Sequence, residues 1–222
     1  MIRKYSNISS SLSTQKAKEQ AGSKAEEKVY FLLSRYGQIN KLHHHIISRF
    51  AFSSGKSSRE PDFVFICEKG IFVIEVKYWA GVIKGSALDN DWFVYSKYGT
   101  TKRKNPLQQN KIPVNKIETM LNNKYPVRSL VVFVSNNASQ LRIPLVVNFD
   151  DLIPYLDRYK PTHRLSISEI EDAYSILDKR KKTDNISIQE HKQNAIRAKT
   201  IAENKRKYSD LPAIIRNVRR KY

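Results

Sequence analysis

The chain has 222 residues and a formal net charge of +19, with 40 lysines and arginines against 21 acidic residues. A chain of this length can bury one substantial core and carry an extension, so we expect one domain with a tail. The positive charge is spread along the whole sequence and gives a pI of about 9.9. It favours nucleic acid as partner, with an anionic membrane surface as the competing alternative.

No apolar stretch approaches the roughly 20 residues that a membrane-spanning helix needs. Residues 1–15 lack the apolar segment of a secretory signal. The single cysteine, Cys67, excludes an internal disulfide and a cysteine-rich zinc site, which agrees with a reducing, cytoplasmic location. We interpret Cys67 as a small buried core residue, because no activating neighbour can be named.

The N-terminal part predicts a helix followed by an extended segment. Residues 1–18 are rich in Ser and Asn without apolar periodicity, and we expect a mobile segment there. Apolar residues at helical spacing predict a helix over 18–36 that Gly37 ends. Residues 39–52 indicate an extended segment that contains three consecutive histidines, 43–45.

The histidine triplet invites a metal assignment. Neighbouring residues on a strand point to opposite faces, so at most His43 and His45 could converge. We favour a surface strand or phosphate contacts over metal ligation.

Two apolar runs of strand length, 63–66 and 71–74, flank a turn at Glu68-Lys69-Gly70. They predict a β-hairpin whose glycine takes the left-handed conformation. Folding the chain about this turn brings Asp62 opposite Glu75, within one residue of register. Directly opposed residues lie about 5 Å apart at Cβ, and like charges there repel, so we expect a positive charge between them.

Lys77 follows Glu75 by two residues, so both side chains leave the same face of a strand while Val76 points into the core. Two carboxylates and an ammonium on one face suit a hard divalent cation beside a phosphate-facing group. A Glu-x-Lys on an exposed strand is common without any function. Here a run that is apolar throughout ends abruptly in Glu75-Val76-Lys77, which favours the functional interpretation.

Further elements follow the hairpin in an α/β order with a mixed central sheet. The pattern predicts short strands around 81–84 and 92–95, a basic loop over 98–105, a helix over 106–121, strands at 130–134 and 145–147, and a helix from 150 to 159. Asn105 should cap the helix that begins at Pro106, and Pro113 should kink or break it.

Lys102, Arg103 and Lys104 precede this helix N-terminus, which is itself an anion site. We expect these residues, with Asn105, to contact nucleic-acid phosphates, the alternative being an ordinary solvated loop. Trp79 and Trp92 are most simply core aromatics, with base stacking as the alternative.

Beyond Lys160 the composition changes. Helical patterns at 168–182 and 188–208 are separated by a polar turn, and the second has a sparse apolar stripe. Such a helix is held by a partner or is marginal alone. A protein partner for these helices and a homodimer both stay open.

The residues of the hairpin resemble a known family. Pro61-Asp62, twelve residues, then Glu75-Val76-Lys77 match the PD-(D/E)-x-K signature of restriction-endonuclease-like nucleases, and the surroundings resemble their nuclease-related domain (NERD) branch. The other landmarks are the helix motif over 22–33 with Ala25 in place of a second glycine, then Tyr78-Trp79-Ala80-Gly81, Trp92 and Asn105-Pro106-Leu107-Gln108-Gln109. The resemblance covers about residues 20–156.

The resemblance implies a restriction-endonuclease-like core, with a mixed central β-sheet flanked by helices, over residues 19–160. A basic helical extension over 161–222 would follow it. The implied metal ligands are Asp62, Glu75, the Val76 carbonyl and Glu26, with Mg²⁺ as the ion and Mn²⁺ as its substitute. Spacing along the first helix favours Glu26 over Glu27.

The resemblance also implies roles in catalysis. Lys77 would position or deprotonate the attacking water and offset transition-state charge. Gln109, with Gln108 as its alternative, would orient a phosphate or that water. The expected activity is phosphodiester hydrolysis, with DNA favoured over RNA and endonuclease over exonuclease, all of which stay open. Family context alone suggests defence against foreign DNA or DNA processing.

Two other function classes compete with a nuclease. One is a non-catalytic nucleic-acid-binding protein that keeps the fold, although a binder has no need for opposed carboxylates at Asp62 and Glu75. The other is peripheral membrane attachment through the C-terminal helices, which fits the charge but not the sparse apolar stripe.

Overall fold

The centre of the fold is β3 (Gly70–Lys77), which lies in the middle of a five-stranded sheet. The computed structural model describes residues 2–48, 50 and 60–181, with the main chain alone for 2–16 and 18. The sheet order is β1 (His44–Ser48), β2 (Phe63–Cys67), β3, β7 (Val127–Phe133) and β8 (Val146–Asn148). The pairs β1–β2 and β2–β3 are antiparallel, whereas β3–β7 and β7–β8 are parallel. The predicted mixed α/β sheet is therefore confirmed.

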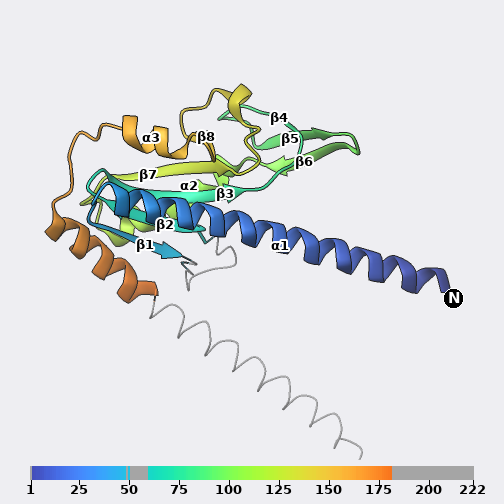
Figure 1. Cartoon of the computed structure of the whole chain (residues 1–222), viewed down its shortest axis with the longest axis horizontal. Helices are drawn as coiled ribbons and strands as arrows, with labels where there is room; N and C mark the ends of the chain where they lie inside the picture. Colours follow the sequence, from blue (N-terminus) through green and yellow to red (C-terminus); the bar gives the residue numbers. More distant parts are fainter. Residues whose placement is uncertain (1, 49, 51–59, 182–222) are drawn as a thin grey trace, which may run out of the picture.

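Helices cover both faces of this sheet (Figure 1). On one face, α1 (Ile2–Ile39) and α3 (Leu152–Arg158) pack with Phe65 and Phe72. On the other, α2 (Pro106–Met120) and the helical residues 167–181 pack with Val64 and Val73. Because β2 and β3 are buried on both sides, their sequences are continuously apolar rather than alternating.

A second, three-stranded antiparallel sheet stands beside the carboxyl end of β3. It consists of β4 (Val82–Lys84), β5 (Asp91–Ser96) and β6 (Gly99–Lys104). Trp92 joins it to the main sheet: its buried ring stacks on Phe133 with centroids 6.3 Å apart, and its Nε1 donates to the Ser86 carbonyl at 2.8 Å. A Cβ at Gly85 would lie 2.3 Å from the same ring, so only glycine fits there. Trp92 is thus a core aromatic.

Three local predictions differ in part from the structure. Residues 99–104 form a strand and not a loop, since β6 pairs along its whole length with β5. The predicted break at Pro113 is absent, since α2 continues through this buried residue. α1 continues past Gly37 to Ile39, and Gly37 serves instead to admit the His44 ring, which a Cβ would approach to 2.2 Å.

α1 also begins at Ile2, well before the expected start near Lys18. No glycine or proline interrupts residues 2–21, so nothing in the chain stops the helix from continuing. Its N-terminal half extends beyond the sheet (Figure 1). Residues 2–18, which were expected to be mobile, are therefore helical.

The helix at 167–181 belongs to the core. Leu165, Ile170, Ala173 and Leu177 are all buried with residues of β2, β3 and α2. Residues 165–177 of the expected extension therefore help to complete the sheet's second face, and the helix expected at 188–208 lies outside the described residues. Among the helices described, none is both long and apolar enough to cross a membrane.

Candidate active site

The β2–β3 hairpin brings Asp62 and Glu75 together. Its register pairs Phe63 with Ile74, so the next residues outward are Asp62 and Glu75. The turn is tight because Gly70 adopts a φ of +122°, which a residue with a Cβ rarely adopts. The predicted opposition of the two carboxylates is confirmed.

Hydrogen bonds and an ion pair hold this group in place. The Asp62 carboxylate accepts a hydrogen bond from the Val76 N–H at 2.7 Å, which ties the residue before β2 to the end of β3. The Lys77 ammonium donates to the Glu75 carboxylate, and these side chains are only 17% and 14% exposed. Val76 itself is buried in the core, as expected from strand alternation.

The electrostatics of this group favour a bound cation. Burial, followed by repulsion from Glu75, raises the pKa of Asp62 from 3.8 to about 7. The charge of Glu26 on α1 raises this pKa further, whereas the Val76 N–H and Lys77 lower it. The hairpin therefore brings Asp62 and Glu75 together, Glu26 of α1 acts on Asp62 through its charge, and Lys77 offsets this negative charge only in part. An all-oxygen donor set of this kind fits Mg²⁺ or Mn²⁺.

A cavity of about 590 Å³ opens beside Lys77. Its lining comes from three elements: Ala17, Ala21 and Gly22 of α1; residues 76–80 at the end of β3; and Val94, Ser96, Thr101 and Arg103 of β5 and β6. The small residues of α1 leave the space open. An adjoining hollow of about 170 Å³ is lined by Lys24 and Lys28, with Tyr78 shared between the two.

The comparison with known families agrees with this geometry. The family model for the nuclease-related domain (NERD) matches residues 21–134, more than half of the chain. The chain belongs to the NERD family. No curated protein and no solved structure matches it. The matched range holds every proposed catalytic residue of the NERD domain, but it ends before β8, α3 and the helix at 167–181, which complete the same core.

The basic residues of β6 in this NERD domain lie on two faces. Strand alternation sends Arg103 into the cavity with Thr101. Lys102 and Lys104 lie on the other face, where both pair with Asp91 at 3.0 and 2.9 Å. Of the three cations expected to contact phosphate, Arg103 is therefore the one that faces the candidate site.

Asn105 has a structural role. It is fully buried, and its side-chain oxygen accepts from the Leu107 N–H at 2.9 Å, which confirms the predicted cap of α2. Its amide also donates to the carbonyls of Ser86, Ala87 and Asp89, the shortest at 2.7 Å. Asn105 is therefore the one residue of the expected phosphate-binding group, 102–105, whose side chain is not exposed to a ligand.

α2 covers the face of β3 that carries Glu75 and Lys77. The Asn110 amide donates to the Val73 carbonyl at 2.8 Å and to the Ser129 hydroxyl at 2.9 Å, which fixes α2 on this face. Val73, Glu75 and Lys77 leave β3 on one side, so the half-buried Gln109 belongs to the helix over the carboxylates. Gln108 instead donates to the Ala87 carbonyl at 3.3 Å.

Sequence reasoning missed three residues near the site. Lys24 and Lys28, one helical turn apart on α1, line the smaller hollow, and Asn110 fixes α2. The i, i+4 spacing of the two lysines beside Ala21 and Ala25 could have indicated a basic helix face next to a groove. Asn110 carried no sequence signal, because its partners lie on other elements.

Proposed function

We propose that this protein is a Mg²⁺-dependent nuclease that hydrolyses phosphodiester bonds, with DNA as the favoured substrate. The observation that carries the proposal is the half-buried, opposed pair Asp62 and Glu75, with Lys77 beside them at the edge of a cavity that Arg103 lines. Opposed carboxylates destabilise a hairpin. Membership of the NERD family supports a functional role for these two carboxylates.

The proposed metal ligands are Asp62, Glu75, Glu26 and the Val76 carbonyl. The N–H of Val76 points toward Asp62, and the N–H and C=O of one strand residue point to the same side, which supports a ligand role for this carbonyl. The Lys77 carbonyl points to the opposite side of β3, where it accepts a hydrogen bond from the Val134 N–H at 2.9 Å. When bound, Mg²⁺ would polarise the scissile phosphate and neutralise developing charge.

The protein's own side chains then orient the reactants. We propose that Arg103 holds a phosphate of the substrate strand in the cavity, by the bidentate contact that a guanidinium makes. Lys77 would hold the attacking water, or take its proton, and would stabilise negative charge on the phosphate as it forms. Gln109, on the helix above Glu75, would orient the same water or a phosphate oxygen.

One assay tests the proposal. The purified full-length chain is incubated with circular DNA, linear DNA or RNA, each with Mg²⁺, Mn²⁺ or a chelator. We expect metal-dependent cleavage that Glu75→Gln and Asp62→Asn reduce to background while nucleic-acid binding persists. Tight binding with no cleavage under any metal condition would favour the non-catalytic alternative.

A matched pair of variants tests the third carboxylate. Glu26→Gln should reduce the rate strongly, because Glu26 acts electrostatically on Asp62. Glu27→Gln, at the next and exposed position of α1, should leave the rate unchanged. The reverse result would transfer the role to Glu27.

A further inference from the structure

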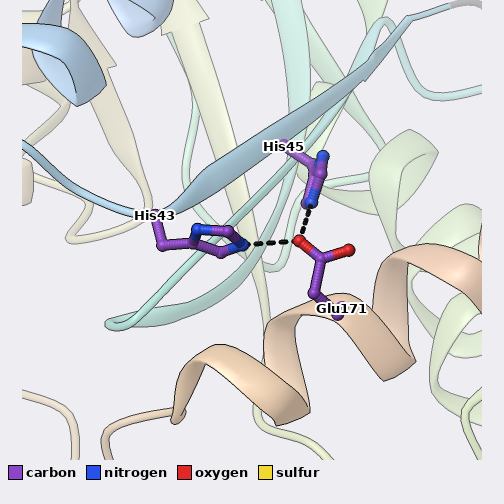
Figure 2. A group of neighbouring side chains, drawn as sticks. All are labelled: His43, His45 and Glu171. Atoms are coloured by element: carbon purple, nitrogen blue, oxygen red, sulfur yellow. Dashed lines mark hydrogen bonds and ion pairs between the residues drawn. The ribbon is translucent and has the colours of Figure 1, made fainter.

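A second cluster of ligand-type side chains lies on the edge strand of the sheet, on residues that take no part in the proposed chemistry. His43 and His45 converge there on Glu171, which comes from the helix at 167–181 (Figure 2). The Glu171 Oε1 lies 2.5 Å from the His43 Nε2 and 2.7 Å from the His45 Nε2. The three ligand atoms all lie within 4.8 Å of one another.

Packing holds the two imidazoles in this arrangement. The ring of His45 stacks on Tyr174, one turn from Glu171 on the same helix, with centroids 3.8 Å apart and planes inclined by 6°. The ring of His43 meets His45 edge-on at 5.7 Å. The hydrogen bonds from His45 and His43 lower the pKa of Glu171, so its carboxylate stays ionised. His43 and Glu171 remain 41% and 48% exposed, which gives an ion access from solvent.

We propose that His43, His45 and Glu171 form a binding site for a divalent transition-metal ion with the ligand preferences of Zn²⁺, and that this ion fastens the helix at 167–181 to β1. Two imidazole nitrogens and one carboxylate oxygen are a donor set that Zn²⁺ takes with water in the fourth position. Mg²⁺ takes oxygen ligands and is not suited to it. The site therefore selects a different metal from the acidic group at Asp62.

Two of the three ligand distances are shorter than a bound ion requires. Ligands at about 2.0–2.2 Å in a tetrahedron lie about 3.3 Å apart. The two Nε2–Oε1 distances are 2.5 and 2.7 Å, so the exposed Glu171 side chain must withdraw by less than about 1 Å. The ion would replace two hydrogen bonds by three bonds that link segments 126 residues apart in the chain.

Such an ion would bind only the folded arrangement. The ligands meet because the helix at 167–181 packs on the second face of the sheet, where Ile170 and Ala173, both close to Glu171 in the sequence, are buried. Binding to the folded chain alone stabilises it in proportion to the metal concentration. The proposal thus adds a structural metal to the attachment of this helix.

The test uses the full-length chain carrying Asp62→Asn and Glu75→Gln, so that its outcome does not depend on the proposed nuclease site. In this background we expect Zn²⁺ and Co²⁺ to bind with a stoichiometry of one in calorimetry, Co²⁺ to develop a visible absorption band, and millimolar Mg²⁺ not to compete. Adding His43→Ala or Glu171→Gln to this background should weaken Zn²⁺ binding at least about tenfold. Both side chains are exposed, so these variants spare the His45–Tyr174 stack.

His163→Ala is the matched control, because His163 also pairs with a glutamate, Glu169, at 3.2 Å, and no second histidine joins that pair within the part of the chain that the structure describes. We expect this variant to keep the affinity, and Zn²⁺ to raise its thermal unfolding midpoint as it does for the parent. Equal Zn²⁺ affinity in the parent and in the His43→Ala and Glu171→Gln variants, or displacement of Zn²⁺ by Mg²⁺, would overturn the proposal.

Discussion

Replacing Asp62 by Asn should stabilise the metal-free protein at neutral pH. Asn has the shape of Asp, and its side-chain oxygen can still accept the Val76 N–H, but it carries no charge for Glu75 to repel. In the wild type the folded state holds the Asp62 proton more tightly than the unfolded state. That contribution to stability is present in full below pH 3.8 and is lost as pH rises toward about 7.

The size of the effect follows from the pKa difference. The pKa of Asp62 in the folded state is about 7. From pH 5 up to that value, each unit of pH lowers the free energy of unfolding of the wild type by up to about 1.4 kcal/mol relative to the variant. The advantage of Asp62→Asn should therefore grow by about 3 kcal/mol from pH 5 to pH 8 if the whole difference is retained, and by at least about 1 kcal/mol if relaxation relieves part of it.

Urea unfolding at constant ionic strength with a chelator measures this difference at each pH. Asp150→Asn is the control, since Asp150 is an exposed carboxylate that also accepts one hydrogen bond, from Asn136. Saturating Mg²⁺ should then stabilise the wild type and not Asp62→Asn. Parallel stability curves for wild type and Asp62→Asn across pH 5 to 8 would refute the argument from half-buried, opposed carboxylates.

Three further predictions concern single side chains. Lys77→Met should lower the cleavage rate about 10²–10⁴-fold while metal binding is retained. If Lys77 transfers a proton, Lys77→Arg should be equally slow in single-turnover assays. Full activity in Lys77→Arg would exclude proton transfer and leave only an electrostatic role for Lys77. In a salt titration, Arg103→Ala should reduce the slope of log DNA affinity against log salt concentration by about 1. Lys102→Ala should reduce it less, because Lys102 already pairs with Asp91. Equal slopes for the two variants would contradict the phosphate contact proposed for Arg103. Asn105→Ala should cost about 1–3 kcal/mol in urea unfolding, since it removes a cap and leaves buried carbonyls unpaired; normal stability with weakened DNA binding would restore its predicted contact role.

The hairpin and its carboxylates could be predicted because everything that fixes them is local. Asp62, the turn at Gly70 and Lys77 lie close together in the sequence, and strand alternation alone assigns each side chain to a face. The cap of α2 was equally local, because it needs only Asn105 and the two residues after it.

The rest depended on contacts that no local pattern encodes. β6 has no apolar residue to signal a strand, and it forms because β5 supplies its hydrogen-bond partners. The split of Arg103 from Lys102 follows from that strand. Glu171 reaches His45 only through the packing of a helix 126 residues later in the chain, so the third ligand of the histidine cluster could not be found from its spacing.

The sheet topology also bears on the order of folding. The β2–β3 hairpin joins neighbouring segments, whereas Ile71 of β3 pairs with Val127 of β7 only when the long chain between them, which holds β4, β5, β6 and α2, is closed. Local pairing closes at lower entropic cost, so we expect the hairpin to form first, while Asp62 and Glu75 are still in water and repel weakly. Their repulsion then grows only as later packing removes the solvent. On this view the charge pair mainly accelerates unfolding, and stopped-flow measurements should show Asp62→Asn slowing that step far more than it speeds refolding.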